Sequence, residues 1–248
     1  MTAAKILMIG LDGAAWHLLL PLCEEGKLPV IQGLIRSGAA LRLQSTIPPY
    51  TPQAWSTLAT GTNPGKHGIL GFSVPDGYAP AKMRYLSSRD LALPPIWTLL
   101  NKHGVRTGLL NVPMTYPPSP LDGFMVTGMM TPSSASQFTW PASLKGYLLS
   151  RIPGYTLDIA VGDKEQTSLS IINRLRQALI KRVEACDLLL KENPVDFFFV
   201  VFETPDRLQH VFYKYLDPAS SLYDTKRGEE VRSKAIEVYR EMDRAVGH

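Results

Sequence analysis

Apolar and polar residues alternate along the chain in blocks that predict an α/β fold. Two continuous apolar runs, Lys5–Leu11 and Val195–Phe202, have the pattern of strands buried on both faces of a parallel sheet. Shorter strands are predicted over Ala39–Gln44, Val105–Val112 and Phe124–Thr127. Because helical patterns separate these strands, we expect a mostly parallel sheet with helices packed against it.

The helical segments have recognisable ends, since proline is favoured at the first helical position and glycine just after the last. Helices are predicted over Trp16–Glu25, Pro29–Ser37, a segment starting at Thr51, Ile96–His103, Leu169–Leu190, a segment opened by Pro205, and Glu229–Val246. Residues 72–93 and 128–163 are rich in proline and glycine and lack periodicity. We expect both to be irregular, lid-like insertions in a single catalytic-type domain that spans residues 1–248.

Charge adds little to this interpretation. The chain of 248 residues is 45% hydrophobic and 19% charged, with a formal net charge of +4. Its densest basic patches, Arg174–Arg182 and Lys226–Arg244, are interleaved with acids at helical spacing. They are predicted to be solvated helix faces, so we expect no nucleic-acid partner.

The two cysteines and the N-terminal residues favour a reducing, cytoplasmic compartment. Cys23 and Cys186 are far apart in apolar helical patterns, which favours reduced thiols in or near the core. The first apolar run is too short for a secretory signal or a membrane span. We therefore expect a cytoplasmic protein that does not associate with membranes.

Thr51 is the first candidate catalytic residue. Pro52 and a helix-compatible segment follow it, so Thr51 is predicted to cap a helix. A hydroxyl there lies at the positive end of the helix dipole, which favours an alkoxide or a phosphoryl oxygen. A purely structural cap is the alternative.

Asp12 and His67 are candidates with structural alternatives. Asp12 directly follows the first apolar run, at the strand end where open α/β sheets bind ligands, although Asp-Gly is also a common turn. His67 stands in a segment rich in turn-forming residues. We expect it to be a hydrogen-bonded loop anchor rather than a ligand or a base.

Asp206 and His210 form a second constellation just past the strongest apolar run. If Pro205 opens a helix, these two residues are one turn apart on one face. A carboxylate and an imidazole at that spacing can bind one ion such as Zn²⁺ or Mn²⁺. The same spacing also occurs often by chance.

Taken together, these motifs resemble the alkaline phosphatase superfamily, and best its branch of type I phosphodiesterases and nucleotide pyrophosphatases, which includes phosphohydrolases and phosphomutases. Three motifs carry the resemblance, in the same order along nearly the whole chain. They are I-G-L-D-G at residues 9–13, T-P with W-S-T-L-A-T-G and P-G-K-H-G-I at residues 51–69, and Asp206 with His210.

The resemblance implies a three-layer α/β sandwich with helices on both faces of the sheet, and a site with two divalent metal ions, zinc or alternatively manganese. By that match, Asp12 and Thr51 bind one ion, and Asp206 and His210 the other. Thr51 is then the nucleophile, because coordination converts a weakly nucleophilic hydroxyl into an alkoxide. The expected substrate is a small phosphomonoester or phosphodiester.

The sequence departs from the family pattern in two places. Gly71-Phe72-Ser73 stands where nucleotide pyrophosphatases carry an asparagine that holds phosphoryl oxygens, which argues against a nucleotide diester. The sequence also has no Asp-His dipeptide, which the family uses with a later histidine to complete both sites. Two ligands per ion is fewer than a catalytic zinc needs. We therefore expect the N-terminal part of a longer family domain, with the sheet incomplete at the C-terminus.

Three further functions share parts of this pattern. A phosphomutase shares the metal core with the hydrolases, and these motifs do not separate the two. A sulfatase is disfavoured, because Gln53 and Ala54 follow Pro52 in place of its C/S-x-P-x-R pattern. An inactive module that binds a phosphorylated ligand or a partner is the third, so activity of this chain alone, its natural substrate and its oligomeric state stay open.

Overall fold

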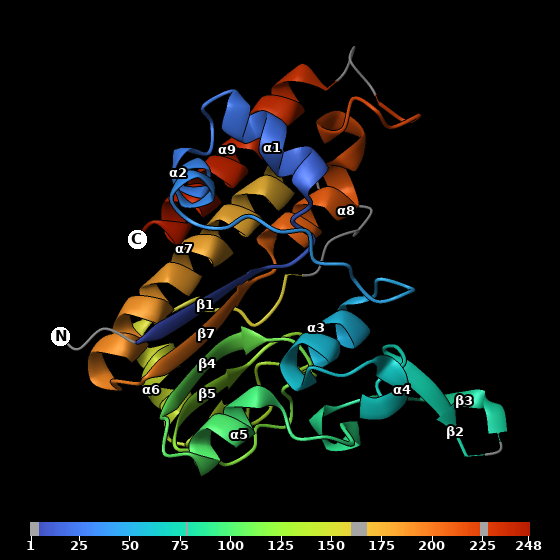
Figure 1. The fold of residues 1–248 in the computed structure, drawn as a ribbon, viewed down its shortest axis with the longest axis vertical. Helices are drawn as coiled ribbons and strands as arrows, with labels where there is room; N and C mark the ends of the chain where they lie inside the picture. Colours follow the sequence, from blue (N-terminus) through green and yellow to red (C-terminus); the bar gives the residue numbers. More distant parts are fainter. Residues whose placement is uncertain (1–4, 78, 160–167, 224–227) are drawn as a thin grey trace. The chain divides into compact units, whose positions relative to one another are not determined.

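The structure of the chain is a computed structural model that describes residues 5–77, 79–159, 168–223 and 228–248 (Figure 1). The chain divides into two compact units. The first consists of Met1–Gly10, Leu43–Leu157 and Ala185–Val201, and the second of Leu11–Arg42, Asp158–Glu184 and Phe202–His248. That the whole chain acts as one catalytic-type domain stays a prediction.

A five-stranded sheet is the centre of the first unit. Its strand order is β1 (Ile6–Leu11), β7 (Phe197–Phe202), β4 (Thr107–Val112), β5 (Gly123–Thr127) and β6 (Thr139–Trp140). Strand β4 pairs in parallel with both β7 and β5, and only the short β6 is antiparallel to its neighbour β5. The predicted α/β fold with a mostly parallel sheet and helices around it is confirmed.

The strands differ in burial in a way that the sequence does not show. All six side chains of β7 and all six of β4 are buried, which confirms the interior positions expected for continuous apolar runs. Strand β1 lies at the edge of the described sheet, and Ile6 and Leu7 are 59% and 56% exposed. The prediction that β1 is buried on both faces was wrong, because no described residue covers the side chains at the start of this strand.

Helices α3 (Thr51–Thr60) and α5 (Ile96–Lys102) pack on this sheet. Ala59 of α3 and Trp97 of α5 share a core cluster with Leu109 of β4 and Phe199 of β7. Trp55 also packs on β1 at Gly10, where an added Cβ atom would lie 2.4 Å from Trp55 Cη2. Glycine at position 10 therefore lets α3 approach β1 closely.

Three segments differ from the sequence prediction. Residues 39–44 have no regular structure, and Leu41 and Leu43 are more than four-fifths exposed, so the predicted strand was wrong. Residues 72–93 are not irregular, because β2 (Ser73–Asp76) and β3 (Ala79–Tyr85) form an antiparallel hairpin that a short 3-10 helix, η1 (Ser88–Asp90), follows.

The segment 128–163 is likewise partly regular. It contains β6 and helix α6 (Leu144–Arg151), whose Leu144 and Leu148 are buried. Residues 160–163 of this predicted insertion lie outside the described residues. The expected lid role of both insertions stays a prediction.

The second unit is helical. It contains α1 (Trp16–Glu24), α2 (Pro29–Ser37), α8 (Thr204–Leu216), α9 (Glu229–Val246) and the first two thirds of α7 (Ser168–Glu192). These boundaries confirm the predicted helices to within two residues. The buried carboxylate of Asp243 on α9 accepts hydrogen bonds from the backbone N–H groups of Val30 and Ile31 at 3.0 and 2.8 Å. It thereby satisfies donors in the first turn of α2 from a position more than 200 residues away.

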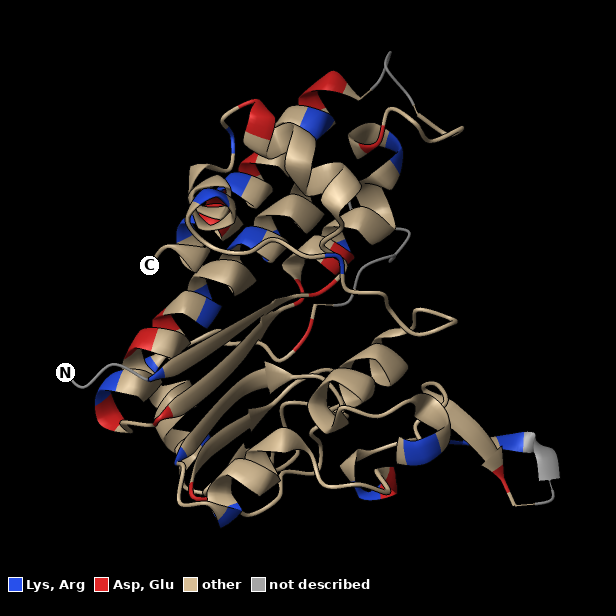
Figure 2. Cartoon of the chain, viewed as in Figure 1, with Lys and Arg blue, Asp and Glu red and all other residues tan. Residues whose placement is uncertain are grey.

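Charged residues gather on the helices and loops (Figure 2). On α9 the basic residues alternate with acids and form pairs such as Lys234 with Glu230 and Arg240 with Glu237, as expected for a solvated helix face. Arg182, however, is only 2% exposed, so its assignment to such a face was wrong. Among the described helices, none combines the length and apolar character needed to cross a membrane.

Candidate active site

The four predicted site residues are divided between the two units. Thr51 belongs to the first unit, whereas Asp12, Asp206 and His210 belong to the second. Each group is therefore described within its own unit.

Thr51 is the first residue of α3, followed by Pro52. The predicted cap was wrong by one position, because Tyr50 is the N-cap, and its side chain makes no capping hydrogen bond. The α-helix still begins at the predicted place, and its first turn directs backbone N–H groups toward the N-terminus. Thr51 is partly buried and lies at this helix N-terminus, where the backbone N–H groups and the helix dipole favour bound or developing negative charge.

Two side chains attach α3 to the segment that follows it. Gln53, which is 5% exposed, donates through Nε2 to the carbonyl of Leu70. One turn further on, the hydroxyl of Thr57 lies 2.9 Å from Nε2 of His67 in the short helix α4 (Pro64–His67). Both contacts hold the helix that carries Thr51.

His67 is the loop anchor predicted from the sequence. Its side chain is fully buried, and Nδ1 accepts a hydrogen bond from the N–H of Ile69 at 3.1 Å. Because Nδ1 is the acceptor, the neutral ring carries its proton on Nε2 and donates to Thr57. Burial lowers the pKa of His67 below its ordinary value near 6.5.

This pKa shift makes the stability of the first unit depend on pH. The unfolded chain binds a proton at His67 near pH 6.5, whereas the folded chain binds it only at lower pH. Unfolding therefore takes up a proton below about pH 6.5, and stability falls by up to about 1.4 kcal/mol per pH unit as the pH decreases. Urea unfolding between pH 7.5 and 5 should show this fall, and a His67→Gln variant, less stable at pH 7.5, should show a smaller one. Equal slopes for both proteins would contradict the assignment.

Asp12 lies where the sequence predicted, at the carboxyl end of β1. Its N–H donates to the carbonyl of Phe202 at 3.0 Å, so the ends of β1 and β7 lie side by side. The next residue, Gly13, has a φ of 70°, and a Cβ atom there would lie 2.8 Å from Cα of Asp206. The amide of Gln209 also donates to the carbonyl of Gly13 at 2.8 Å. The Asp12–Gly13 turn therefore packs directly on the first turns of α8.

Asp206 and His210 face each other on α8, one turn apart as predicted. Oδ1 of Asp206 lies 3.4 Å from Nε2 of His210, and the two side chains are 18% and 62% exposed. Arg207 approaches the same carboxylate at 3.6 Å while it binds Asp158 through two hydrogen bonds of 3.0 and 2.7 Å. The pair is thus accessible from solvent, with a fixed cation beside it.

The Asp206–His210 geometry fits one metal ion as a partial ligand set. Oxygen and nitrogen ligands about 2.0–2.2 Å from a tetrahedral ion stand roughly 3.4 Å apart, which matches the observed separation. Among the described residues, however, no three His, Cys, Asp or Glu side chains gather closely enough to hold one ion. This part of the chain therefore offers a two-residue set.

A buried ion pair supports this set and was missed at the sequence level. Arg182 of α7 donates to both carboxylate oxygens of Glu203 at 2.7 Å, and both side chains are more than nine-tenths buried. Glu203 is the N-cap of α8, three residues before Asp206. The available signal was the spacing of Arg182, which falls in the apolar stripe of α7 three residues from both Leu179 and Ala185.

Three motifs follow one another along the chain: an aspartate at a strand end, a threonine at a helix start, and an aspartate and a histidine one turn apart on a later helix. Comparison with known proteins shows which family the chain matches. The family described as type I phosphodiesterase / nucleotide pyrophosphatase matches residues 6–248. The chain belongs to this family. Among curated proteins, a sequence search finds no match.

Solved structures share the fold of this phosphodiesterase-family chain. Phosphonoacetate hydrolase from Sinorhizobium meliloti 1021 in complex with phosphonoacetate is similar, with a TM-score of 0.61 and 16% sequence identity. The same hydrolase in complex with phosphonoformate has a TM-score of 0.63 and 17% sequence identity. Each match covers 98% of this chain and 52% of the hydrolase chain. The chain thus spans about half the length of these relatives, and at this identity the likeness shows the fold alone.

Proposed function

We propose that this chain carries the nucleophile and four of the metal ligands of a phosphohydrolase that acts on small phosphorylated or phosphonate substrates. The observation that carries this proposal is the pairing of Asp206 with His210 at metal-ligand separation, directly beside the Asp12 turn. Membership of the phosphodiesterase family over nearly the whole chain supports the reaction class.

In this proposal Thr51 is the nucleophile. On a phosphomonoester, its Oγ1 forms a bond to phosphorus while the bond from phosphorus to the ester oxygen breaks; the threonine proton passes to solvent, and the leaving oxygen takes up a proton from solvent. The N-terminus of α3 stabilises the negative charge that develops on the phosphoryl oxygens. Water then hydrolyses the phosphothreonine and regenerates the hydroxyl, so the products are phosphate and an alcohol.

The metal ligands are assigned by the same proposal. Asp12 and Thr51 would hold one divalent ion, and Asp206 and His210 the other. Bound there, such ions would acidify the threonine hydroxyl and neutralise charge on the leaving oxygen. Within the chain itself, the buried Glu203–Arg182 pair fixes the start of α8 and so orients Asp206, while Asp158 holds Arg207 beside it.

A metal titration tests this assignment. Zn²⁺ binding measured by calorimetry should weaken at least tenfold in Asp206→Asn and in His210→Gln, since each removes one of two ligand side chains. His17→Gln is the matched control, because His17 of α1 contacts Tyr213 at 3.2 Å and takes no part in the proposed set. Unchanged affinity in both site variants would disprove the ligand assignment.

Activity gives a second test on the full-length protein. Release of free phosphate from an aryl phosphate should cease with a chelator and return with Zn²⁺ or Mn²⁺. Phosphate release that a chelator leaves unchanged would rule out the metal-dependent reaction.

A further inference from the structure

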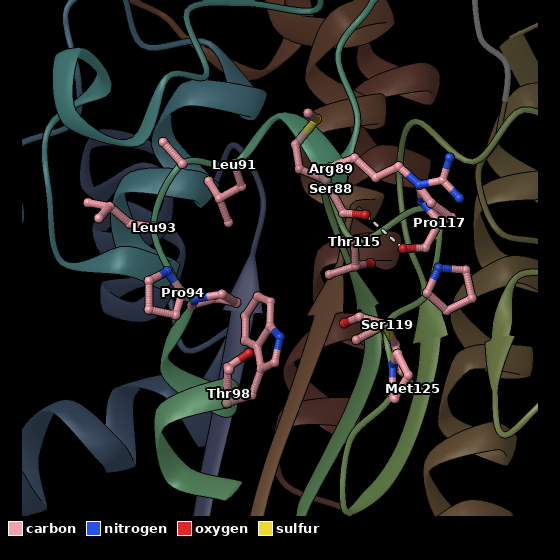
Figure 3. A pocket seen from close by; sticks show the side chains of 16 residues that line it. Ser88, Arg89, Leu91, Leu93, Pro94, Thr98, Thr115, Pro117, Ser119 and Met125 are labelled. Atoms are coloured by element: carbon pink, nitrogen blue, oxygen red, sulfur yellow. Dashed lines mark hydrogen bonds between the residues drawn. The ribbon is translucent and has the colours of Figure 1, made fainter. Parts of the chain in front are cut away.

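A cavity of about 490 Å³ lies within the first unit, at the carboxyl end of β4 (Figure 3). One wall is formed by residues 88–98, including Leu91, Leu93 and Pro94, and the other by residues 114–120 together with Met125 of β5. Its volume falls in the range of small-molecule sites, and the carboxyl edge of a parallel sheet is where α/β proteins bind ligands.

The two walls are fastened to each other. Ser88 donates from its N–H to the carbonyl of Tyr116 and from its hydroxyl to the carbonyl of Pro117, both at 2.7 Å (Figure 3). Five of the lining residues are prolines, which restrict the backbone of both walls. The cavity is therefore preformed, and a ligand would not have to order it.

Several polar side chains of the lining can donate a hydrogen bond. Thr98 and Ser119 contribute hydroxyls that form no hydrogen bond to another described residue. Trp97, which is 5% exposed, has an indole N–H that is buried without an acceptor in the described part of the chain. The lining includes no carboxylate. A ligand that accepts hydrogen bonds would pair with the hydroxyls of Thr98 and Ser119.

Arg89 is the only charged side chain of the lining. It reaches over Pro117 at the rim (Figure 3) and forms no ion pair with any described residue. The neighbouring carboxylate, Asp90, does not neutralise it, because Asp90 binds Arg84 at 2.7 Å and the N–H and hydroxyl of Ser87. The remaining lining consists mainly of leucine, methionine, proline and tryptophan.

We propose that this cavity binds an organic anion, with an apolar body between the proline-rich walls and its carboxylate, sulfonate or phosphate group at Arg89. An apolar body gains from burial against the leucine, methionine and tryptophan side chains. The anionic group gains charge-assisted hydrogen bonds from the guanidinium. The proposal does not depend on Thr51 being the nucleophile, because no residue of the proposed metal or phosphoryl site lines the cavity.

Two fluorescent probes that share one aromatic body test this inference. The anion 1-anilinonaphthalene-8-sulfonate should bind saturably at one site, and Arg89→Gln should weaken it about tenfold. N-phenyl-1-naphthylamine, which lacks the sulfonate, should bind Arg89→Gln as well as it binds the unmodified protein. Lys102→Gln, which removes an exposed cation of α5 outside the lining, should leave both affinities unchanged.

A variant with a larger side chain in the cavity tests whether the probes bind there. Ser119 is exposed at the mouth of the cavity, so Ser119→Trp should be accommodated in the fold while it blocks both probes. The circular dichroism and urea midpoint of each variant should match those of the unmodified protein. Binding of the sulfonate that neither Arg89→Gln nor Ser119→Trp reduces would overturn the proposal.

Discussion

Replacing Thr51 with alanine should lower phosphate release by at least about a thousandfold in the full-length protein, because the variant lacks the oxygen that attacks phosphorus in the proposed mechanism. The loss should appear in kcat, since the substrate contacts at the N-terminus of α3 stay in place. A steady-state assay with an aryl phosphate and saturating Zn²⁺ measures it. Full activity in Thr51→Ala would show that Thr51 is not the nucleophile.

Two further variants separate chemistry from folding. Thr51→Ser keeps a hydroxyl at the first position of α3 and should retain a substantial fraction of the activity. Thr60→Ala removes a threonine at the other end of the same helix, whose hydroxyl donates to the carbonyl of Ser56 at 2.7 Å. It should lower stability slightly and leave kcat unchanged. A loss in Thr60→Ala as large as in Thr51→Ala would indicate that α3 itself is damaged.

The largest effect on stability is expected at Arg182. Arg182→Met should lower the free energy of unfolding by roughly 3–5 kcal/mol, because it leaves the Glu203 carboxylate buried without its cation. Urea denaturation at pH 7.5, followed by circular dichroism, measures this change. The double variant Arg182→Met with Glu203→Gln should be more stable than Arg182→Met alone, since no uncompensated charge is then buried.

A more exposed ion pair of the same unit provides the control. Arg176, also on α7, binds Glu241 of α9, and the two side chains are 43% and 15% exposed, compared with 2% and 8% for Arg182 and Glu203. Solvent screens such a pair, so Arg176→Met should cost less than about 1 kcal/mol. Equal losses in Arg176→Met and Arg182→Met would contradict the account of the buried pair.

The local pattern of the sequence was enough to predict most helices. Pro29 at the start of α2 and Gly38 directly after its end mark both boundaries of this nine-residue helix. Signals of the same kind mark ends of α1, α5 and α9. Interior strands such as β7 were also predictable, because a continuous run of large apolar residues is stable only when covered on both faces.

Long-range pairing was not predictable from the same patterns. The apolar run of β1 does not reveal that β1 is an edge strand, and residues 39–44 alternate like a strand but have no partner among the described strands. The β2–β3 hairpin has prolines that suggested irregular structure, yet Pro75 pairs with Met83 in an antiparallel ladder, and the register shifts only between Pro75 and Asp76. Contacts with neighbouring strands decide whether such a segment forms a strand.

The positions of the candidate site residues were predictable in part, and their roles stay predictions. Asp12 at a strand end and Asp206 with His210 on one helix face follow from local patterns, and the structure places them there. The buried Arg182–Glu203 pair could not be assigned, since a basic residue in an apolar stripe does not identify its partner 21 residues away. The cap at Tyr50 shows the one-residue error expected at helix ends.

The central claim is that Thr51 forms a covalent bond to the phosphoryl group. Full-length protein mixed with an aryl phosphate and Zn²⁺, quenched in acid during turnover and digested, should yield a phosphorylated peptide whose fragmentation spectrum places the phosphoryl group on Thr51. Thr51→Ala should give no such peptide. Turnover without any phosphothreonine at position 51, or phosphorylation of another residue in its place, would contradict the account.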